Sequence, residues 1–201
     1  MREFEKAEEF FPSQSRPRRM KFNRSRTPRD KRKGIVAEFA ADAGTGSFTK
    51  KGSGILNLGA TNTWGGATVL AGGTLRCLCD RAIPFDTTVE LAGGSLAMNG
   101  MKMANGDPCP KKWAVDANRA KELGGTIPYA GRLDFIEGST LEVRNAAEMG
   151  EDGEKLVLLK ATDGFTGRPT LVGTVDPEWH VSFSAKKIVL APNRGLMLIV
   201  R

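Results

Sequence analysis

Apolar residues between Lys50 and Cys77 fall in three short runs, and each run is bounded by glycine. The runs are Ile55–Leu58, Ala67–Leu70 and Thr74–Cys77. They are too short for helices and are rich in residues that favour pleated strands. The glycine pairs between them reach backbone angles that tight turns require. The pattern therefore predicts short strands that alternate with glycine turns.

The same pattern recurs about every twenty residues. Val69–Leu75 matches Glu90–Leu96 at an offset of 21, and Gly138–Val143 is a more distant echo. Strands and glycine turns that repeat at this period indicate coils stacked along an axis, because one coil alone leaves an apolar face and a sheet edge exposed. Three leucines, one in each coil, are expected to form a column inside the stack: Leu56, Leu75 and Leu96.

Motif residues follow one another in a fixed order between Thr49 and Leu75. They are Lys50 and Lys51 before Gly52-Ser53-Gly54, Leu56-x-Leu58, Asn62-Thr63-Trp64, Gly65-Gly66 with Thr68, and Gly73-Thr74-Leu75; Ala67 is one departure. This segment resembles the autotransporter-associated β-strand repeat, also called the passenger-associated transport repeat. The resemblance implies a right-handed parallel β-helix on a large secreted or surface-displayed bacterial protein. The family motif carries no catalytic residues, so the resemblance assigns none.

We therefore predict an all-β fold, with a right-handed parallel β-helix or solenoid over residues 34–201. Residues 101–129 break the rhythm and are interpreted as an insertion that covers an apolar end of the coil; a functional loop is the alternative. Within it, Trp113, Ala117 and Ala120 have helical spacing, which predicts a short helix from Trp113 to Leu123. Residues from about 170 to 201 are expected to form an antiparallel carboxy-terminal cap. Three successive strands are expected in the cap: 179–183, 187–190 and 195–200.

Positive charge is concentrated in residues 1–33, which hold twelve Lys and Arg against five Asp and Glu. The whole chain has a formal net charge of +7, so the remaining residues are neutral overall. Few residues of this arm are apolar, and we predict that it is disordered. We interpret it as a linker, or as upstream sequence included by a misplaced start. The alternative is weak polyanion binding through the arm.

The first apolar stretch after the arm, Gly34–Ala41, is short and contains Glu38, so it does not match a signal peptide. The chain also has no apolar run of 18 residues that would span a membrane as a helix. We expect a carboxy-terminal fragment of a longer protein, or a chain with a misplaced start, and a secreted or cell-surface location by resemblance. The expected partners are neighbouring coils of a longer chain or a second copy of this one, and surface glycans are a further candidate.

Three cysteines, Cys77, Cys79 and Cys109, are too few for a disulfide framework. Cys77 and Cys79 would share one strand face, which is a poor geometry for a bridge between them. A zinc site is the alternative, but a C-x-C pair with one distant Cys and a single His in the chain makes a weak ligand set. We interpret the cysteines as buried structural thiols and expect no metal and no cofactor.

Two groups of side chains are candidates for catalysis. His180 has Asp176 and Glu178 as neighbours, but on a strand it would share an exposed face with Ser182, opposite the face of Trp179, Val181 and Phe183. The second group is Asp134, Glu142 and Arg144, because acidic and basic residues on one coil face cleave polysaccharides in some β-helix enzymes. We interpret both groups as surface residues and expect no catalytic residue.

The sequence therefore predicts a structural or display segment that is not an enzyme. A carbohydrate-binding or polysaccharide-degrading β-helix is the alternative. An aromatic stripe would favour that alternative, but Trp64, Trp113 and Trp179 lie far apart in the sequence. Polyanion binding by the arm is the second alternative.

Overall fold

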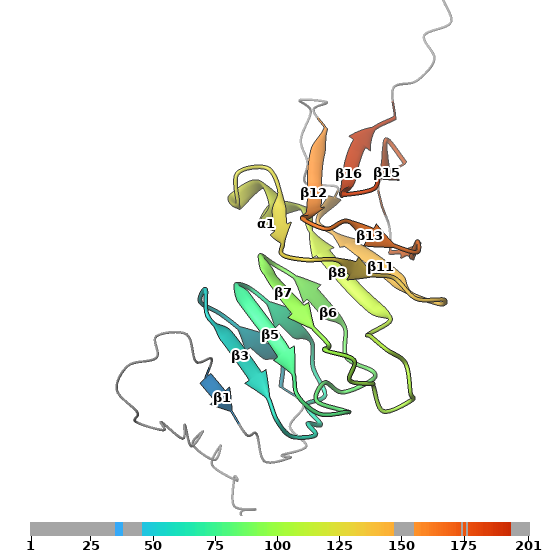
Figure 1. Ribbon diagram of the computed structural model, residues 1–201. Coiled ribbons are helices and arrows are strands. Elements are labelled where there is room, and N and C mark those ends of the chain that lie inside the picture. The colour runs from blue at the N-terminus through green and yellow to red at the C-terminus, as the bar shows by residue number, and fades with distance from the viewer. Residues whose placement is uncertain (1–34, 38–45, 147–154, 174, 176, 194–201) are drawn as a thin grey trace, which may run out of the picture.

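The computed structural model describes residues 35–37, 46–146, 155–173, 175 and 177–193. Over these residues the chain forms sixteen strands in four sheets and one short helix (Figure 1). Within the same residues, no helix has the length and apolar character needed to span a membrane. The predicted all-β fold is confirmed at this level. The predicted arm, residues 1–33, lies outside the described residues.

The largest sheet contains six parallel strands from residue 48 to residue 172. Each strand pairs with the strand of the next coil, in the order β14-β11-β8-β6-β4-β2. We call it the six-stranded sheet. Its strands are β2 (Phe48–Lys50), β4 (Thr68–Leu70), β6 (Val89–Leu91), β8 (Lys112–Asp116), β11 (Thr140–Arg144) and β14 (Thr170–Val172).

A second parallel sheet has the order β1-β3-β5-β7. Its strands are β1 (Ile35–Ala37), β3 (Ile55–Leu58), β5 (Gly73–Cys77) and β7 (Gly94–Ala97). From β2 to β8, successive strands alternate between this sheet and the six-stranded sheet. Each turn of the chain therefore adds one strand to each sheet, and the hydrogen bonds of a strand go to the turns before and after it.

The expected leucine column lies in the second sheet. Leu56 pairs with Leu75, and Leu75 pairs with Leu96, at the offsets that the sequence repeat predicts. Leu75, in the middle, is fully buried, and its two neighbours are partly buried against the core. An equivalent column in the six-stranded sheet, Leu70 to Leu91 to Val115, is fully buried. The prediction that apolar residues of consecutive coils stack inside the fold is confirmed.

The predicted helix is shorter than expected, because Trp113–Asp116 belongs to strand β8 and α1 spans only Ala117–Glu122. Trp113 is 2 % exposed and pairs with Val89 inside the stack, which fixes an extended backbone there. Asp116 then accepts hydrogen bonds from the backbone N–H groups of Asn118 and Arg119, and so caps the first turn of the helix. The segment expected to interrupt the stack therefore contains a strand of it.

The carboxy-terminal part of the described chain forms a mixed sheet with the order β15-β16-β12-β9. β12 is parallel to β9 and antiparallel to β16, and β16 is antiparallel to β15. The predicted antiparallel cap therefore begins with the β12–β16 pair, whereas β14 continues the parallel sheet because its three residues stay in register with β11. The expected strand 195–200 lies outside the described residues. The strands are β9 (Ile127–Tyr129), β12 (Leu156–Ala161), β15 (Trp179–Phe183) and β16 (Lys187–Pro192).

A tyrosine joins the mixed sheet to the second parallel sheet. The hydroxyl of Tyr129 donates to the carbonyl of Leu96, at 3.0 Å, and accepts from the N–H of Leu96, at 3.3 Å. The hydroxyl therefore gives both the N–H and the carbonyl group of Leu96 a hydrogen-bond partner, which would otherwise have to come from another strand. Burial raises the pKa of Tyr129 to about 12, so the hydroxyl remains a donor at neutral pH.

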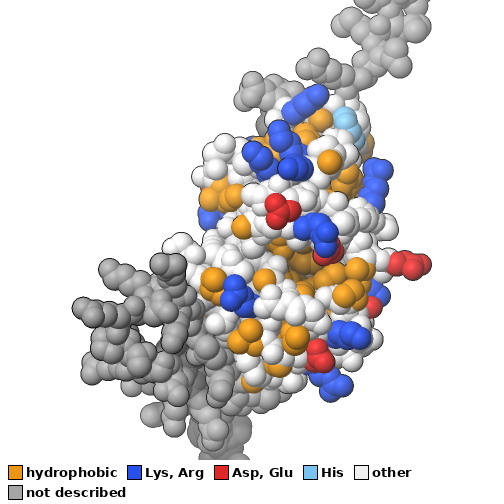
Figure 2. Space-filling model, viewed as in Figure 1, with side chains coloured by type: hydrophobic (Ala, Val, Ile, Leu, Met, Phe, Trp, Pro, Cys, Tyr) orange, Lys and Arg blue, Asp and Glu red, His pale blue; other side chains and the backbone are white. Residues whose placement is uncertain are grey.

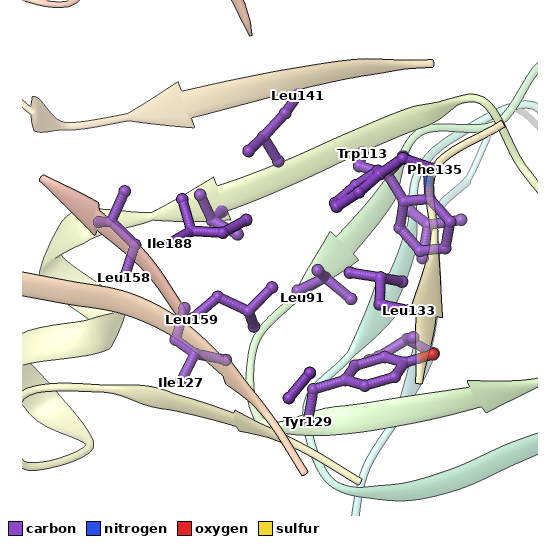
Figure 3. Packing of buried hydrophobic residues seen from close by; sticks show 14 of the residues in the cluster. Leu91, Trp113, Ile127, Tyr129, Leu133, Phe135, Leu141, Leu158, Leu159 and Ile188 are labelled. Carbon is purple, nitrogen blue, oxygen red and sulfur yellow. The ribbon is translucent and has the colours of Figure 1, made fainter. Parts of the chain in front are cut away.

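Aromatic rings pack in the core beside a short two-stranded parallel sheet. This sheet pairs β10 (Leu133–Asp134) with β13 (Phe165–Thr166). The rings of Trp113 and Phe135 meet edge to face with centroids 6.1 Å apart, and Phe165 lies 6.0 Å from Phe135. Figure 3 shows Trp113 and Phe135 side by side at one end of the cluster, and Leu158, Leu159 and Ile188 at the other.

The column predicts a clear stability difference between two neighbouring leucines. Leu75→Ala removes a fully buried side chain from the middle of the column, whereas Leu78 is 48 % exposed. We expect Leu75→Ala to lower the free energy of unfolding by about 3 kcal/mol and Leu78→Ala to change it by less than about 1 kcal/mol. Urea denaturation of the two variants measures both values, and equal losses would contradict the inward column.

Candidate functional site

Lys50, the last residue of β2, carries a buried ammonium at a corner of the stack. Its side chain is 6 % exposed. Its Nζ atom donates to the carbonyl oxygens of Lys51 and Gly52, both at 2.8 Å, and of Gly72 at 2.9 Å. These three acceptors match the three N–H donors of an ammonium. Lys50 therefore fastens the turn after β2 to the turn after β4, one coil further along.

The charge of Lys50 is balanced by backbone dipoles. No ion pair among the described residues includes Lys50. Burial lowers the pKa of Lys50, because removal from water disfavours the charged form. The three carbonyl oxygens act in the opposite direction, since they hydrogen-bond to that charged form. The lysine is a structural cross-link, with no donor left to bind a ligand.

Glycines at the same corner let the coils approach closely. Gly73 has a φ of 64°, and a Cβ atom there would lie 2.3 Å from the carbonyl oxygen of Gly54 and 2.8 Å from Lys50 Nζ. Gly94, in the following coil, pairs with Gly73. A Cβ atom on Gly94 would lie 2.9 Å from the backbone nitrogen of Gly72 in the preceding coil. A side chain at either position would push the coils apart.

Asn62 fastens a second corner. The residue is 4 % exposed, and its Nδ2 atom donates to the carbonyl oxygens of Ala60 and Ala82, both at 2.8 Å. Its backbone N–H donates to the carbonyl oxygen of Arg81 at 3.2 Å. Ala82 and Arg81 belong to the next coil, so one asparagine contributes two hydrogen bonds between coils. Buried polar groups need such partners, because an unpaired group is costly.

A chain of hydroxyl groups fastens a third corner. Trp64 Nε1 donates to Thr68 Oγ1 at 3.0 Å, Thr68 Oγ1 lies 3.1 Å from Thr87 Oγ1, and Thr87 Oγ1 donates to the carbonyl oxygen of Gly66 at 2.9 Å. The hydroxyl of Thr68 therefore donates to Thr87, and the chain of donors runs in one direction. The ring of Trp64 also stacks on Phe48, with centroids 4.8 Å apart.

The three charged residues considered as one candidate group lie in two sheets. Asp134 is on β10, where it accepts hydrogen bonds from Arg132 Nε, at 3.0 Å, and from the Thr166 hydroxyl. Glu142 and Arg144 lie on β11 and form an ion pair at 2.8 Å. The possible grouping of Asp134 with them is corrected by the topology, because β10 pairs with β13 and not with the six-stranded sheet.

Arg144 has a second partner that sequence reasoning missed. Its Nη1 atom lies 2.9 Å from Glu90 Oε2, on β6. The hydrogen bond with Glu142 is the first cause that raises the pKa of Arg144, and the nearby charge of Glu90 adds to it. Glu90 and Glu142 both pair with Ala114 of the intervening strand, so the strand register was the one signal that would have located Glu90. An arginine held between two carboxylates is a structural arrangement.

His180 lies on the exposed face of β15, as predicted, together with Ser182, while Trp179, Val181 and Phe183 are partly buried. Its Nδ1 atom lies 2.8 Å from Asn193 Oδ1. The Nδ2 atom of Asn193 donates to the carbonyl oxygen of Pro177 at 2.6 Å, which orients the amide. Nδ1 of His180 is therefore the protonated nitrogen, and Nε2 faces away from this contact. Asp176 lies outside the described residues.

The cysteines are free thiols, and the predicted burial is confirmed for Cys77 and Cys109. Cys79 is partly buried. Burial is the first cause that raises the pKa of Cys77 to about 12 and that of Cys109 to about 11, so both are neutral thiols near pH 7. The Sγ atom of Cys77 contacts Met98 Sδ at 3.8 Å. Among the described residues, no group of three or more His, Cys, Asp or Glu side chains is placed to hold a metal ion.

The three tryptophans lie on separate parts of the fold. Trp64 precedes β4, Trp113 is in the core on β8, and Trp179 begins β15 in the mixed sheet.

Lys50, Asn62 and Thr68 all lie within one segment that also matches a known family. A family model described as the Passenger-associated-transport-repeat matches residues 48–76. Residues 48–76 form one such repeat. The predicted resemblance is confirmed for this segment. No curated protein and no solved structure matches the chain at a significant level.

The polar positions of the repeat act as fasteners between coils. The lysine, asparagine and threonine of its motif make the three corner contacts, and its glycines allow the close approach between them. The extra residue Ala67 does not displace Thr68, which is fully buried and bonded. The lysine, asparagine, threonine and glycines of the motif therefore contribute to the stacking of coils.

The contacts of Lys50 predict that its side chain contributes far more to the free energy of unfolding than that of its neighbour Lys51. Lys50→Met keeps an aliphatic chain but leaves the three carbonyl oxygens without their donor, and we expect a loss of roughly 2–4 kcal/mol in unfolding free energy. Lys51 is exposed and serves as the matched control, with Lys51→Met expected to change stability by less than about 0.5 kcal/mol. Thermal or urea unfolding provides the comparison. A tolerated Lys50→Met would exclude the fastener role.

The glycine corner predicts a difference between two glycines with similar backbone angles. Gly73 and Gly100 have φ values of 64° and 76°, but nothing lies within 4 Å of a Cβ built on Gly100. Gly100→Ala is expected to cost roughly 1–2 kcal/mol, from backbone strain alone. Gly73→Ala adds the clash with the preceding coil, and we expect a cost above about 3 kcal/mol. The same unfolding measurement tests this, and similar costs would show that close packing at the corner is unimportant.

Proposed function

We propose that this chain is a structural or display segment of the passenger of a secreted or surface-exposed bacterial protein, and that it is not an enzyme. The passenger-associated transport repeat at residues 48–76 supports this role. Such a role requires a rod of stacked coils that holds the outer part of the passenger away from the cell to which it is attached.

One observation carries the proposal. The side chains of Lys50, Asn62 and Thr68 are buried, and they hydrogen-bond to the same or the next coil. A catalytic or binding motif would instead keep its polar groups accessible to a ligand. The sequence that marks the family is therefore one that builds a scaffold.

We infer that the scaffold is a right-handed parallel β-helix. The alternation of β2 to β8 between two parallel sheets supports a helical path. Right-handedness is supported by a general rule, since parallel strands of one sheet are joined by right-handed crossovers in about 98 % of cases.

The partners that fit this scaffold are further coils, from a longer chain or from a second copy. Among the described residues, β2 and β14 are the outer strands of the six-stranded sheet. Such edges pair readily with other strands. Leu171 and Val172 of β14 are also 39 % and 38 % exposed, which is high for apolar side chains in a sheet. A coil placed on β14 would cover them.

The proposed absence of catalysis is supported by the engagement of the candidate residues. Asp134, Glu142 and Arg144 are bonded to protein partners, and His180 contacts Asn193. A polysaccharide-degrading β-helix would need carboxylates that converge on one open groove, and the two candidate carboxylates, Asp134 and Glu142, lie in different sheets.

Surface display is tested by protease accessibility in the source bacterium. An epitope inserted at Gly100 should leave the fold intact, because this turn is open and nothing lies within 4 Å of a Cβ atom built there. We expect protease added to intact cells to remove the epitope, while a cytoplasmic marker protein survives. Removal of the epitope only after lysis would refute the proposed location and, with it, the display role.

A further inference from the structure

The outer face of the mixed sheet carries several cations and few acids. Strand register, with the bulge between Val157 and Leu159, places eight residues on this side of the sheet, of which Ala191 is buried. We call this set the cap face: Lys155, Val157, Lys160, His180, Ser182, Lys187, Val189 and Ala191. Figure 2 shows Lys and Arg side chains beside the histidine, with apolar side chains between them. The described residues from 155 to 193 include five Lys or Arg and two Asp or Glu.

Two lysines of the cap face lie directly opposite each other. Lys160 of β12 pairs with Lys187 of β16 in the antiparallel register, and both are exposed. No ion pair among the described residues includes either of them. Like charges in directly opposed positions destabilise a sheet, so an anion between these two ammonium groups would remove an unfavourable interaction.

The other end of the cap face is hollowed. Lys155, His180 and Ser182 line an open hollow whose floor includes Val189 and Ala191. The contact from Asn193 fixes the His180 ring, with Nδ1 as the protonated nitrogen, so the ring is held in place at the rim. This end therefore combines a cation, two further polar groups and an apolar floor, which suits a ligand that carries hydroxyl groups, negative charge and a carbon surface.

We propose that the cap face binds an acidic polysaccharide. Lys155 immediately precedes β12, and Lys160 lies near its end. Leu156 pairs with Leu190 and Lys160 with Lys187, with a bulge between them, so the two lysines are about four steps of β16 apart, or roughly 13 Å at 3.3 Å per residue. An extended polymer with repeated carboxylates reaches both ends, whereas a small anion does not. Single-stranded nucleic acid fits less well, because the aromatic residues of β15, Trp179 and Phe183, face the core and leave no platform for stacking bases.

Two acidic residues among those that the structure describes border the face. Glu178 precedes β15, and Asp163 follows β12. The sequence between β11 and β12 also contains four acidic residues, Glu148, Glu151, Asp152 and Glu154, outside the described residues. This acidic stretch is the competing occupant that the experiment must separate from a polysaccharide. The inference goes beyond the scaffold role and does not depend on it.

Binding of the full chain to polygalacturonate, measured at several salt concentrations, tests the proposal. The variant Lys155→Gln/Lys160→Gln/Lys187→Gln removes three charges from the cap face. The control Lys51→Gln/Lys102→Gln/Lys121→Gln removes three from exposed lysines outside the mixed sheet. Both retain residues 1–33, so any affinity due to that basic segment is common to them. We expect about a tenfold loss for the first variant, because exposed ion pairs contribute modestly, and little change for the control.

Each other outcome of the experiment would overturn the proposal. Equal losses in the two variants would show that only net charge matters. A preference of the wild type for single-stranded DNA over polygalacturonate, lost in the first variant, would assign the cap face to nucleic acid. No binding by the wild type, with binding restored by Glu151→Gln/Asp152→Asn, would assign the face to the chain's own acidic stretch. Dextran, which is uncharged, should not bind at all.

Discussion

Parallel pairing between residues about one coil apart is the constraint on which the rest of the structure depends. A strand of three to five residues has too few hydrogen bonds to persist alone, and each one here obtains them from the coils on either side. The side chains obey the same rule, since Leu75 is covered by Leu56 and Leu96 of adjacent coils. No coil has a core of its own, and the cost of ordering the chain is repaid only by stacking.

The turns at the corners of the stack are where this constraint limits which residues the sequence can use. Parallel strands are joined by turns, and the turns of adjacent coils must lie nearly in contact. Gly73 satisfies the steric part of that requirement and Lys50 the polar part, because its ammonium holds carbonyl oxygens of both turns. The same logic explains why Asn62 and Thr68 are buried although their side chains are polar. The motif of the repeat is a set of solutions to one packing problem.

Much of this arrangement could be predicted from the sequence, because its signals are local. The leucine column follows from a period of two within strands and about twenty between them, and the face of His180 follows from alternation. The start of α1 could not be predicted from spacing, because Trp113 and Ala117 fit a helix until the partner of Trp113 in β6 is known. The burial of Lys50 was also hidden, since a lysine is ordinarily exposed. Locating Glu90 as a partner of Arg144 required the strand register across three coils.

The reach of Arg144 has a consequence for how the stack comes apart. Its guanidinium extends over Ala114, from β11 to Glu90 on β6, and so crosses about two inter-strand spacings, or roughly 9.6 Å. Backbone hydrogen bonds connect only nearest neighbours, and a stack held by them alone would fray one coil at a time from an open end. The Arg144–Glu90 pair joins β6 to β11 across β8, so it adds a coupling on the order of 1 kcal/mol or less that favours joint release of these three strands over loss of one coil at a time.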